Sequence, residues 1–369
     1  MRRLKLLAGL ATLAVCICPL PAKKKKPEEI TQTLALPPDP PATVAADTSR
    51  LGFHVSPLSG KGLLSQQVRD ALKALLRSSG GASIVKLRAF VAGSGDLRRV
   101  PAIVSETFTE KHLPLPAVSV IQIGALPMEG AQVAIESMAV AKKEMNPSGL
   151  VFVSGQAAPS DTPLVKVAAL AQKSAADLKT ALQAAGSGPA DALRVTCFCS
   201  TLDDYAAVRA VVEPDYRHAA LSFVQLQRSP FRSVVECEAV ARASRKAQGR
   251  VQFENPAGLA QSPNYSQLAL VSAPRLILSG TQVSYGYQDS DARLAFQRLA
   301  KALEAGGSSV KDIAFASFYP LSSSIAEQVR RIRFEFFDKQ RPPAATMQPF
   351  EGLPAMDAGF AVDVVAIAR

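Results

Sequence analysis

The same pair of alternating segments recurs three times along the 369-residue chain. Apolar and other residues alternate with a period near two, which is typical of half-buried strands. Leu126-Pro127 and Glu129-Gly130 mark the turn within the first pair. The pairs cover 117–127 with 132–139, 220–226 with 235–241, and 344–354 with 362–368. Internal repetition of this kind predicts three tandem copies of one module.

Helical periodicity precedes each strand pair at a matching place. A leucine stands four residues before a glycine that ends the helix in each copy: Leu76 and Gly80, Leu182 and Gly186, Leu303 and Gly307. The pattern predicts α+β modules of order β-β-α-β-β-α-β-β, the first without a clear first strand. We expect the modules at 51–141, 142–250 (with a basic linker at its end) and 251–369.

The first 50 residues differ from the rest of the chain. Basic residues precede a short apolar run that ends near Ala22, so 1–22 is predicted to be a secretory signal peptide and the protein to be periplasmic or secreted. A single membrane anchor and a lipoprotein modified at Cys16 are the alternatives. No later segment is long and apolar enough to span a bilayer. Residues 23–50, rich in Lys and Pro, are predicted to be a linker without regular structure.

Charge and cysteine content exclude some functions. The net charge of +11 includes the lysine run at 23–26, and aromatic and basic residues do not interleave, so no nucleic-acid partner is expected. Cys197, Cys199 and Cys237 are predicted to be small core residues, with a disulfide between Cys237 and one of the others as the alternative. No metal-ligand spacing is present, and neither a metal nor a cofactor is expected.

The strand pairs resemble those that close the Rid (YjgF) family of enamine/imine deaminases. The segments 150–156 and 276–282 resemble the family's second strand, and 263–267 resembles its opening signature. The resemblance implies a chorismate-mutase-like fold whose sheets turn inward in a trimer. Three linked modules can close such a ring within one chain, so we expect a monomeric pseudo-trimer around a central β-barrel-like core.

The resemblance also implies where a site lies, between neighbouring modules. The family's carboxylate-binding arginine is replaced by apolar residues: Val118, Leu221 and Ala345. Its water-positioning glutamate matches Glu136 and Glu238, with Val365 in the third module. Ser154-Gly155, Ser279-Gly280 and Tyr265 match positions that hold the ligand. The glycines also suit turn geometry alone, and the glutamates also suit ordinary hydrogen-bonded strand positions.

These matches predict a secreted, diverged Rid protein without the standard imino-acid site, serving as a small-ligand-binding or structural module. The alternative is an enamine or imine hydrolase for a substrate without a carboxylate, with Glu238 or Glu136 positioning water. One cleft is expected to combine Glu238 with Tyr265 and Ser279. With Leu221 in place of arginine, it is expected to prefer a small neutral or cationic ligand.

Overall fold

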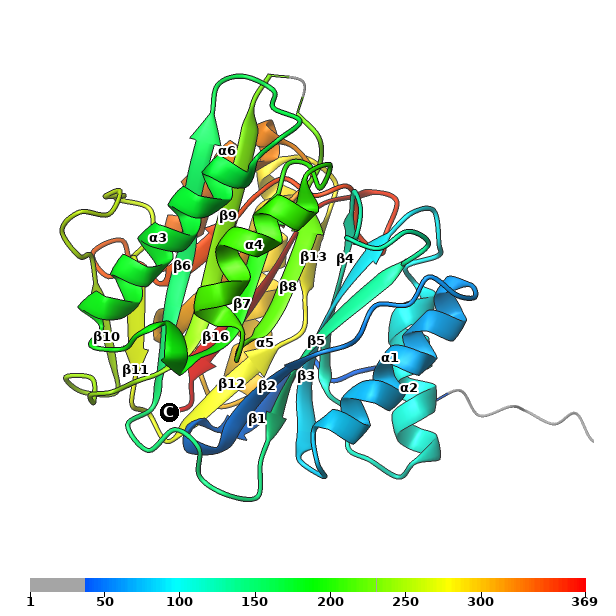
Figure 1. Cartoon of the computed structure of the whole chain (residues 1–369). Helices are drawn as coiled ribbons and strands as arrows, with labels where there is room; N and C mark the ends of the chain where they lie inside the picture. The colour runs from blue at the N-terminus through cyan, green and yellow to red at the C-terminus, as the bar shows by residue number, and fades with distance from the viewer. Residues whose placement is uncertain (1–36, 230) are drawn as a thin grey trace, which may run out of the picture. The chain divides into compact units, whose positions relative to one another are not determined.

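Three mixed sheets, one for each predicted module, form the framework of the molecule (Figure 1). The computed structural model describes residues 37–229 and 231–369, so the predicted signal peptide and the lysine run lie outside the described residues. Each sheet contains four equivalent strands in the same order. They are β2 (Leu51–Val55), β5 (Val133–Val140), β3 (Ser83–Ala92) and β4 (Ala117–Ile123); β6 (Leu150–Ser160), β9 (Ser233–Arg242), β7 (Ala192–Cys199) and β8 (Ala220–Gln225); and β12 (Arg275–Ser279), β16 (Ala358–Ile367), β14 (Ile313–Pro320) and β15 (Ala344–Met347).

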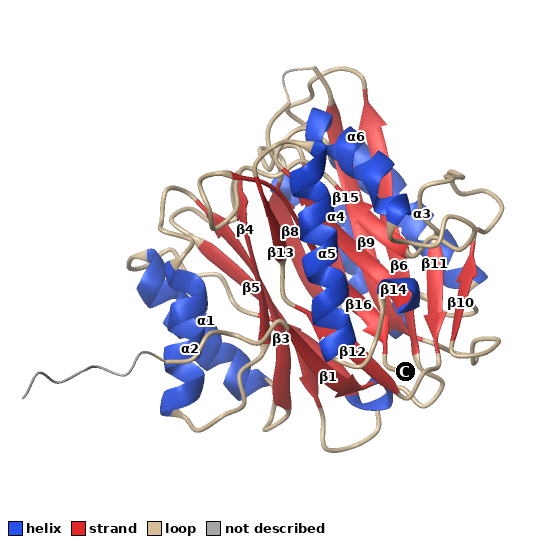
Figure 2. Ribbon diagram, turned by 180° about the vertical axis from the view of Figure 1, so that it is seen from behind, coloured by secondary structure: helices blue, strands red, loops and turns tan. Residues whose placement is uncertain are grey.

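Two helices cover the outer face of each sheet (Figures 1 and 2). They are α1 (Leu64–Ser78) and α2 (Arg99–Glu110), α3 (Ala168–Ala184) and α4 (Tyr205–Tyr216), and α5 (Asp289–Ala305) and α6 (Ser323–Ile332). Their apolar stripes are buried, as Val68, Leu72 and Leu75 of α1 show. The predicted α+β fold is therefore confirmed. Its detail is corrected, because one strand rather than two lies between the paired helices; β3, for example, runs for ten residues without a break.

Two sheets are completed by strands from elsewhere in the chain. β1 (Thr43–Asp47) pairs antiparallel with β12 of the third module, although 23–50 was predicted to lack regular structure. β10 (Val251–Glu254) and β11 (Leu268–Val271) extend the sheet of the second module through β6, although the sequence placed them in the third. The short β13 (Gln282–Tyr285) pairs with β16. Local periodicity identifies a strand but does not state which sheet edge it joins.

The inner faces of the three sheets meet in one barrel-like core made of layers. One apolar layer includes Phe53, Met138, Phe152, Val240, Phe315 and Val365. Another includes Phe90, Ala134, Phe198, Val224, Tyr319 and Ala361. Every module contributes to both layers, so the face that the helices leave uncovered is buried against the other two modules. The predicted intramolecular pseudo-trimer is thereby confirmed as an arrangement of modules.

The cysteines lie in the second module. Cys197 on β7 and Cys237 on β9 face each other in register and form a disulfide, with a Cα–Cα distance of 4.1 Å. Cys199 is a free, buried thiol whose pKa is raised to about 12, chiefly by burial. The structure thus selects the disulfide from the two alternatives. Within the described residues, no helix has the length and apolarity needed to cross a membrane.

Candidate functional site between the second and third modules

Contacts of the opening turns show in which direction the ring runs. Ser154 lies in a bulge of β6, and its Oγ accepts a 2.8 Å hydrogen bond from the backbone N–H of Ala345 in the third module. Gly280 lies against Val118 of the first module, where a Cβ would come within 2.9 Å of the carbonyl oxygen. Each opening turn therefore faces the closing strands of the following module, and the third faces the first. The expected cleft of Glu238 with Ser279 is not assembled.

Glu136 and Glu238 lie in the closed core, between its apolar layers. Arg88 donates to Glu136 at 2.9 and 2.6 Å and to Glu238 at 2.8 Å, and Arg194 donates to Glu238 at 3.0 Å. Burial opposes ionisation of Glu136, but the charges of Arg88 and Arg194 outweigh it and lower the pKa. Both carboxylates are buried. That they position water for hydrolysis stays a prediction, and their place among paired arginines gives it no support.

A third carboxylate completes this ionic cluster. Asp363 accepts a hydrogen bond from Lys86 at 3.3 Å and also one from Ser119. Strand register places Asp363 opposite Ser317, as Glu238 lies opposite Thr196. Asp363, rather than the predicted Val365, is therefore the third-module counterpart of Glu238. The error is two residues, which leaves the side chain on the same face of the strand.

A different carboxylate, Glu236, lies beside the opening turn of its own module. A Cβ on Gly155 would collide with its carboxylate, so the close approach requires glycine there. The Gln348 amide of the third module donates to Glu236 Oε2. Burial, and to a lesser degree the charge of Glu238, raise the pKa of Glu236 to about 7. This carboxyl therefore changes its charge near neutral pH.

Tyr265 joins the same region because its loop belongs to the second module's sheet. Burial and the neighbouring Glu236 raise the pKa of the Tyr265 phenol. Arg333 donates at 2.5 Å to the carbonyl of Asn264 in this loop, and its Nε has no hydrogen-bond partner in the described part of the chain. Burial, assisted by the charge of Arg330, lowers the pKa of Arg333 to about 10. The structure thus brings Tyr265 to Ser154 and Gly155 and separates it from Ser279.

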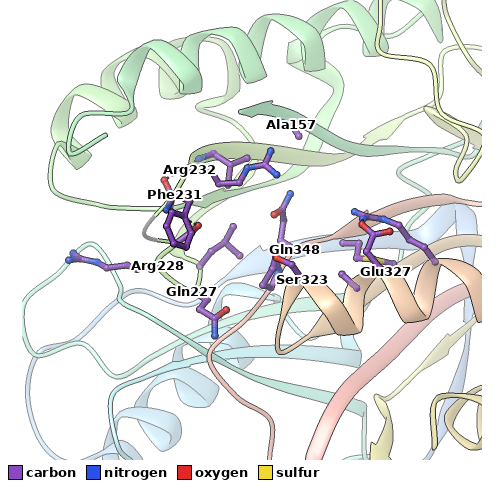
Figure 3. A pocket seen from close by; sticks show the side chains of 16 residues that line it. Ala157, Gln227, Arg228, Phe231, Arg232, Ser323, Glu327 and Gln348 are labelled. Atoms are coloured by element: carbon purple, nitrogen blue, oxygen red, sulfur yellow. Dashed lines mark hydrogen bonds and ion pairs between the residues drawn. The ribbon is translucent and has the colours of Figure 1, made fainter. Parts of the chain in front are cut away.

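A cavity of 510 Å³ lies between the second and third modules and adjoins this group through Gln348. Figure 3 shows the side chains that line it. The second module contributes one wall through Ala157 and Leu226, and α6 contributes the other through Ser323 and Arg330. Gln348 lies between them, so its amide connects the cavity with Glu236. The remaining lining residues are Ser200, Gln227, Arg228, Ser229, Phe231, Arg232, Val234, Ala326, Glu327, Met347 and Pro349.

The charge of this lining is mainly positive. It contains the guanidinium groups of Arg228, Arg232 and Arg330 and a single carboxylate, Glu327, which pairs with Arg330. The Oδ1 atom of Asp203 lies 3.5 Å from Arg228 at the exposed rim. Guanidinium groups present paired donors that suit carboxylate oxygens. The cavity can therefore receive an anion, although the arginine of the family's motif is absent from the adjoining β15.

Leu221 lies in another cleft, between the first and second modules. It lines a cavity of 220 Å³ with Ser56 and Leu58 from the first module and Tyr205 from the second. Neither Tyr265 nor Glu238 lines this cavity. The combination for which a neutral or cationic ligand was expected is therefore not present. In the described residues, no group of three or more His, Cys, Asp or Glu side chains is placed to hold a metal ion.

The family model described as Endoribonuclease L-PSP matches residues 61–141 and 142–244, which are the first two modules. The chain belongs to the Rid (YjgF) family. None of the curated proteins compared with it matches.

Solved structures, among them proteins described as Rid or YjgF family members, are each similar to about one third of the chain. Rid-family YyfB from Yersinia pestis has 14% identity and a TM-score of 0.29; the match covers 32% of this chain and 98% of the YyfB chain. Rv2704 from Mycobacterium tuberculosis has 19% identity and a TM-score of 0.24, covering 32% of this chain and 99% of its own. Yeast Mmf1 has 17% identity and a TM-score of 0.24, covering 32% and 99%.

The sequence missed the residues that make this Rid cleft distinctive. Glu236 was passed over in favour of Glu238, although both face the same side of β9. The crowding at Gly155 is the feature that distinguishes them, and it appears only when β6 and β9 are paired. Arg330 and Gln348 follow no motif. The two arginines in the last turn of α6 are visible in the sequence, but they do not indicate a cleft.

Proposed function

We propose that this Rid-family chain binds a small molecule bearing a carboxylate in the cleft between its second and third modules. The observation that carries the proposal is the 510 Å³ cavity whose lining has three arginines and one glutamate. This volume falls within the usual range for small-molecule sites. Arg330 and its neighbours supply the counter-charge that the apolar residue Ala345 cannot.

Binding is favoured over hydrolysis by the position of Gln348. Its amide lines the cavity and donates to Glu236, whose side chain is buried and does not itself line the cavity. A hydrolase needs its carboxylate within reach of the attacking water. In this arrangement, Gln348 separates Glu236 from a molecule in the cavity.

The second candidate is an enamine or imine hydrolase, and the pKa of Glu236 favours it. A carboxyl that titrates at about 7 is suited to accept and return a proton near neutral pH. Such an enzyme would need Gln348 to turn away when substrate enters. Glu236, rather than Glu136 or Glu238, would then be the residue in contact with water.

Location and assembly belong to the same proposal. The predicted signal peptide supports a periplasmic or secreted protein, and the Cys197–Cys237 disulfide is in keeping with an oxidising compartment. Closure of the three sheets within one chain supports a monomer. A molar mass of one chain in analytical ultracentrifugation is the expected result, and a stable homotrimer would contradict it.

Calorimetric titration of the mature protein tests the binding site directly. We expect 2-oxobutanoate to bind and its uncharged amide, 2-oxobutanamide, not to bind. Arg330→Gln should weaken the binding of 2-oxobutanoate by roughly tenfold or more, since it removes a charge-assisted contact. Arg331→Gln is the matched control, because this adjacent arginine is exposed and pairs instead with Asp289. Equal binding of acid and amide, or no binding of either, would overturn the proposal.

An ammonia-release assay separates the two candidate functions. The binding proposal expects no acceleration of 2-aminoacrylate hydrolysis above background. The hydrolase would be established instead if the protein accelerates the reaction, Glu236→Gln abolishes the acceleration, and a correctly folded Glu238→Gln variant retains it.

A further inference from the structure

The first module contains another cavity, far in sequence from the cleft between the second and third modules. It has a volume of 500 Å³ and lies where the C-terminal ends of α1 and α2 meet the beginning of β3. Its apolar walls are Leu76, Ile84, Phe108, Leu113 and Pro114. No residue of the cleft between the second and third modules takes part in it.

The loop between α2 and β4 leaves this space open. The chain turns away from α2 at His112, whose φ is 54°. Leu113 comes next, is 39% exposed and lines the cavity. Phe108, a buried residue in the last turn of α2, lines the same cavity. The cavity therefore extends from a buried aromatic side chain to the surface beside Leu113.

Basic side chains surround this apolar space. Lys73, Arg77 and Lys111 belong to its lining, and no acidic residue does. None of the three makes an ion pair within the described ranges 37–229 and 231–369. The Nζ atom of Lys142 lies 3.9 Å from where a Cβ on Gly81 would stand, which adds a fourth positive charge nearby. A ligand that fits must therefore combine an apolar body with an anionic end.

We propose that this cavity is a binding site for a single-chain amphiphile with an anionic head, of which a fatty acid is the simplest. The hydrocarbon chain would lie against Leu76, Ile84 and Phe108. The carboxylate would remain at the opening, near Lys73 and Lys111, where it keeps part of its hydration. Burial of the apolar chain supplies most of the binding free energy, and the lysines select the charge of the head.

The test uses the mature protein and ligands that differ in one property at a time. Dodecanoate should displace an environment-sensitive fluorescent fatty-acid probe, and octanoate should do so more weakly, by roughly fourfold for each methylene no longer buried. Dodecanol should bind more weakly than dodecanoate, and dodecyltrimethylammonium should not bind. Equal binding of the anionic, neutral and cationic amphiphiles would overturn the proposal.

Variants locate the site. Leu113→Tyr places a larger side chain in the wall of the cavity and should weaken the binding of dodecanoate at least tenfold. Lys73→Gln combined with Lys111→Gln should weaken dodecanoate but not dodecanol, whereas Lys301→Gln, an exposed lysine of α5, should change neither. If Leu113→Tyr fails to fold, Leu76→Phe provides the same test. Unchanged dodecanoate binding in a folded cavity-filling variant would also overturn the proposal.

Arg330→Gln should leave dodecanoate binding intact, because Arg330 lines the other cavity. Failure of this proposal is therefore distinguishable from failure of the proposed function.

Discussion

The guanidinium of Arg88 in the first module donates at 2.8 Å to the carboxylate of Glu238 in the second, and both side chains are buried. The same guanidinium donates to Glu136, and Lys86 pairs with Asp363 of the third module at 3.3 Å. The three cations Lys86, Arg88 and Arg194 thereby neutralise one carboxylate from each module. This cluster lies where the three inner sheet faces meet, and it ties the modules to one another.

Removal of Arg88 should be severely destabilising. Arg88→Met leaves Glu136 and Glu238 short of counter-charge in a buried place, and breaking such a pair costs about 3–5 kcal/mol. Urea denaturation followed by circular dichroism measures the loss. Arg98→Met, at an exposed arginine that pairs with Asp96, should leave the free energy of unfolding close to that of wild type. A loss at Arg88 no greater than at Arg98 would contradict a structural role for the cluster.

Glu236 should make the stability fall as pH rises. Its pKa is about 7 in the folded chain, against an ordinary value of 4.5, so between these values the folded state holds a proton that the unfolded state has released. Unfolding then becomes easier with increasing pH, by roughly 3 kcal/mol in all across this window. Glu236→Gln should remove this part of the pH dependence of the melting temperature, and Glu304→Gln, at an exposed glutamate, should preserve it. Parallel pH profiles for wild type and Glu236→Gln would refute the prediction.

Strand β1 should be needed to stabilise the third module. Two backbone hydrogen bonds flank the ladder between β1 and β12, from Gly280 N–H to Ala42 O and from Thr48 N–H to Pro274 O. Alternate residues of an antiparallel strand point their N–H groups to the partner strand. The N–H of Val44 therefore points to β12, and that of Ala45 points away from it. Val44→Pro should therefore cost about 1–3 kcal/mol by leaving a carbonyl of β12 unpaired. Hydrogen exchange at 275–279 should accelerate.

Ala45→Pro is the matched control for the β1 prediction. Its N–H is not used in the ladder with β12, and its side chain is exposed. It should leave both stability and exchange close to wild type. Similar effects of the two proline substitutions would show that the pairing with β12 is not what stabilises this edge.

The disulfide should stabilise the second module. Cys197 and Cys237 are 40 residues apart, so replacing both with alanine should lower the free energy of unfolding by roughly 2–5 kcal/mol. Cys199→Ala removes a sulfur from the same buried core without breaking a bond, and it should cost less. Thermal melts of the two variants under oxidising conditions provide the comparison. A smaller loss for the double variant than for Cys199→Ala would contradict the prediction.

Local patterns carried most of the fold information. Alternation in 117–139 and its two counterparts identified the strand pairs, and the leucine–glycine spacing located the first helix of each module. Both signals arise from neighbouring residues that share one face, so they are visible before any long-range contact forms. The three modules followed from these repeats, and the resemblance of their strand pairs to Rid proteins implied the family and the inward-facing sheets.

Only the tertiary structure decided how the modules use one another. The sequence could not state that β1 completes the third sheet, because a strand's own residues do not specify the edge it joins. Nor could it distinguish Glu236 from Glu238, since a shift of two residues keeps a side chain on the same face of a strand. Glu236 lies beside Gly155 and Gln348, whereas Glu238 pairs with Arg88. Contacts between residues far apart in the chain determine these different surroundings.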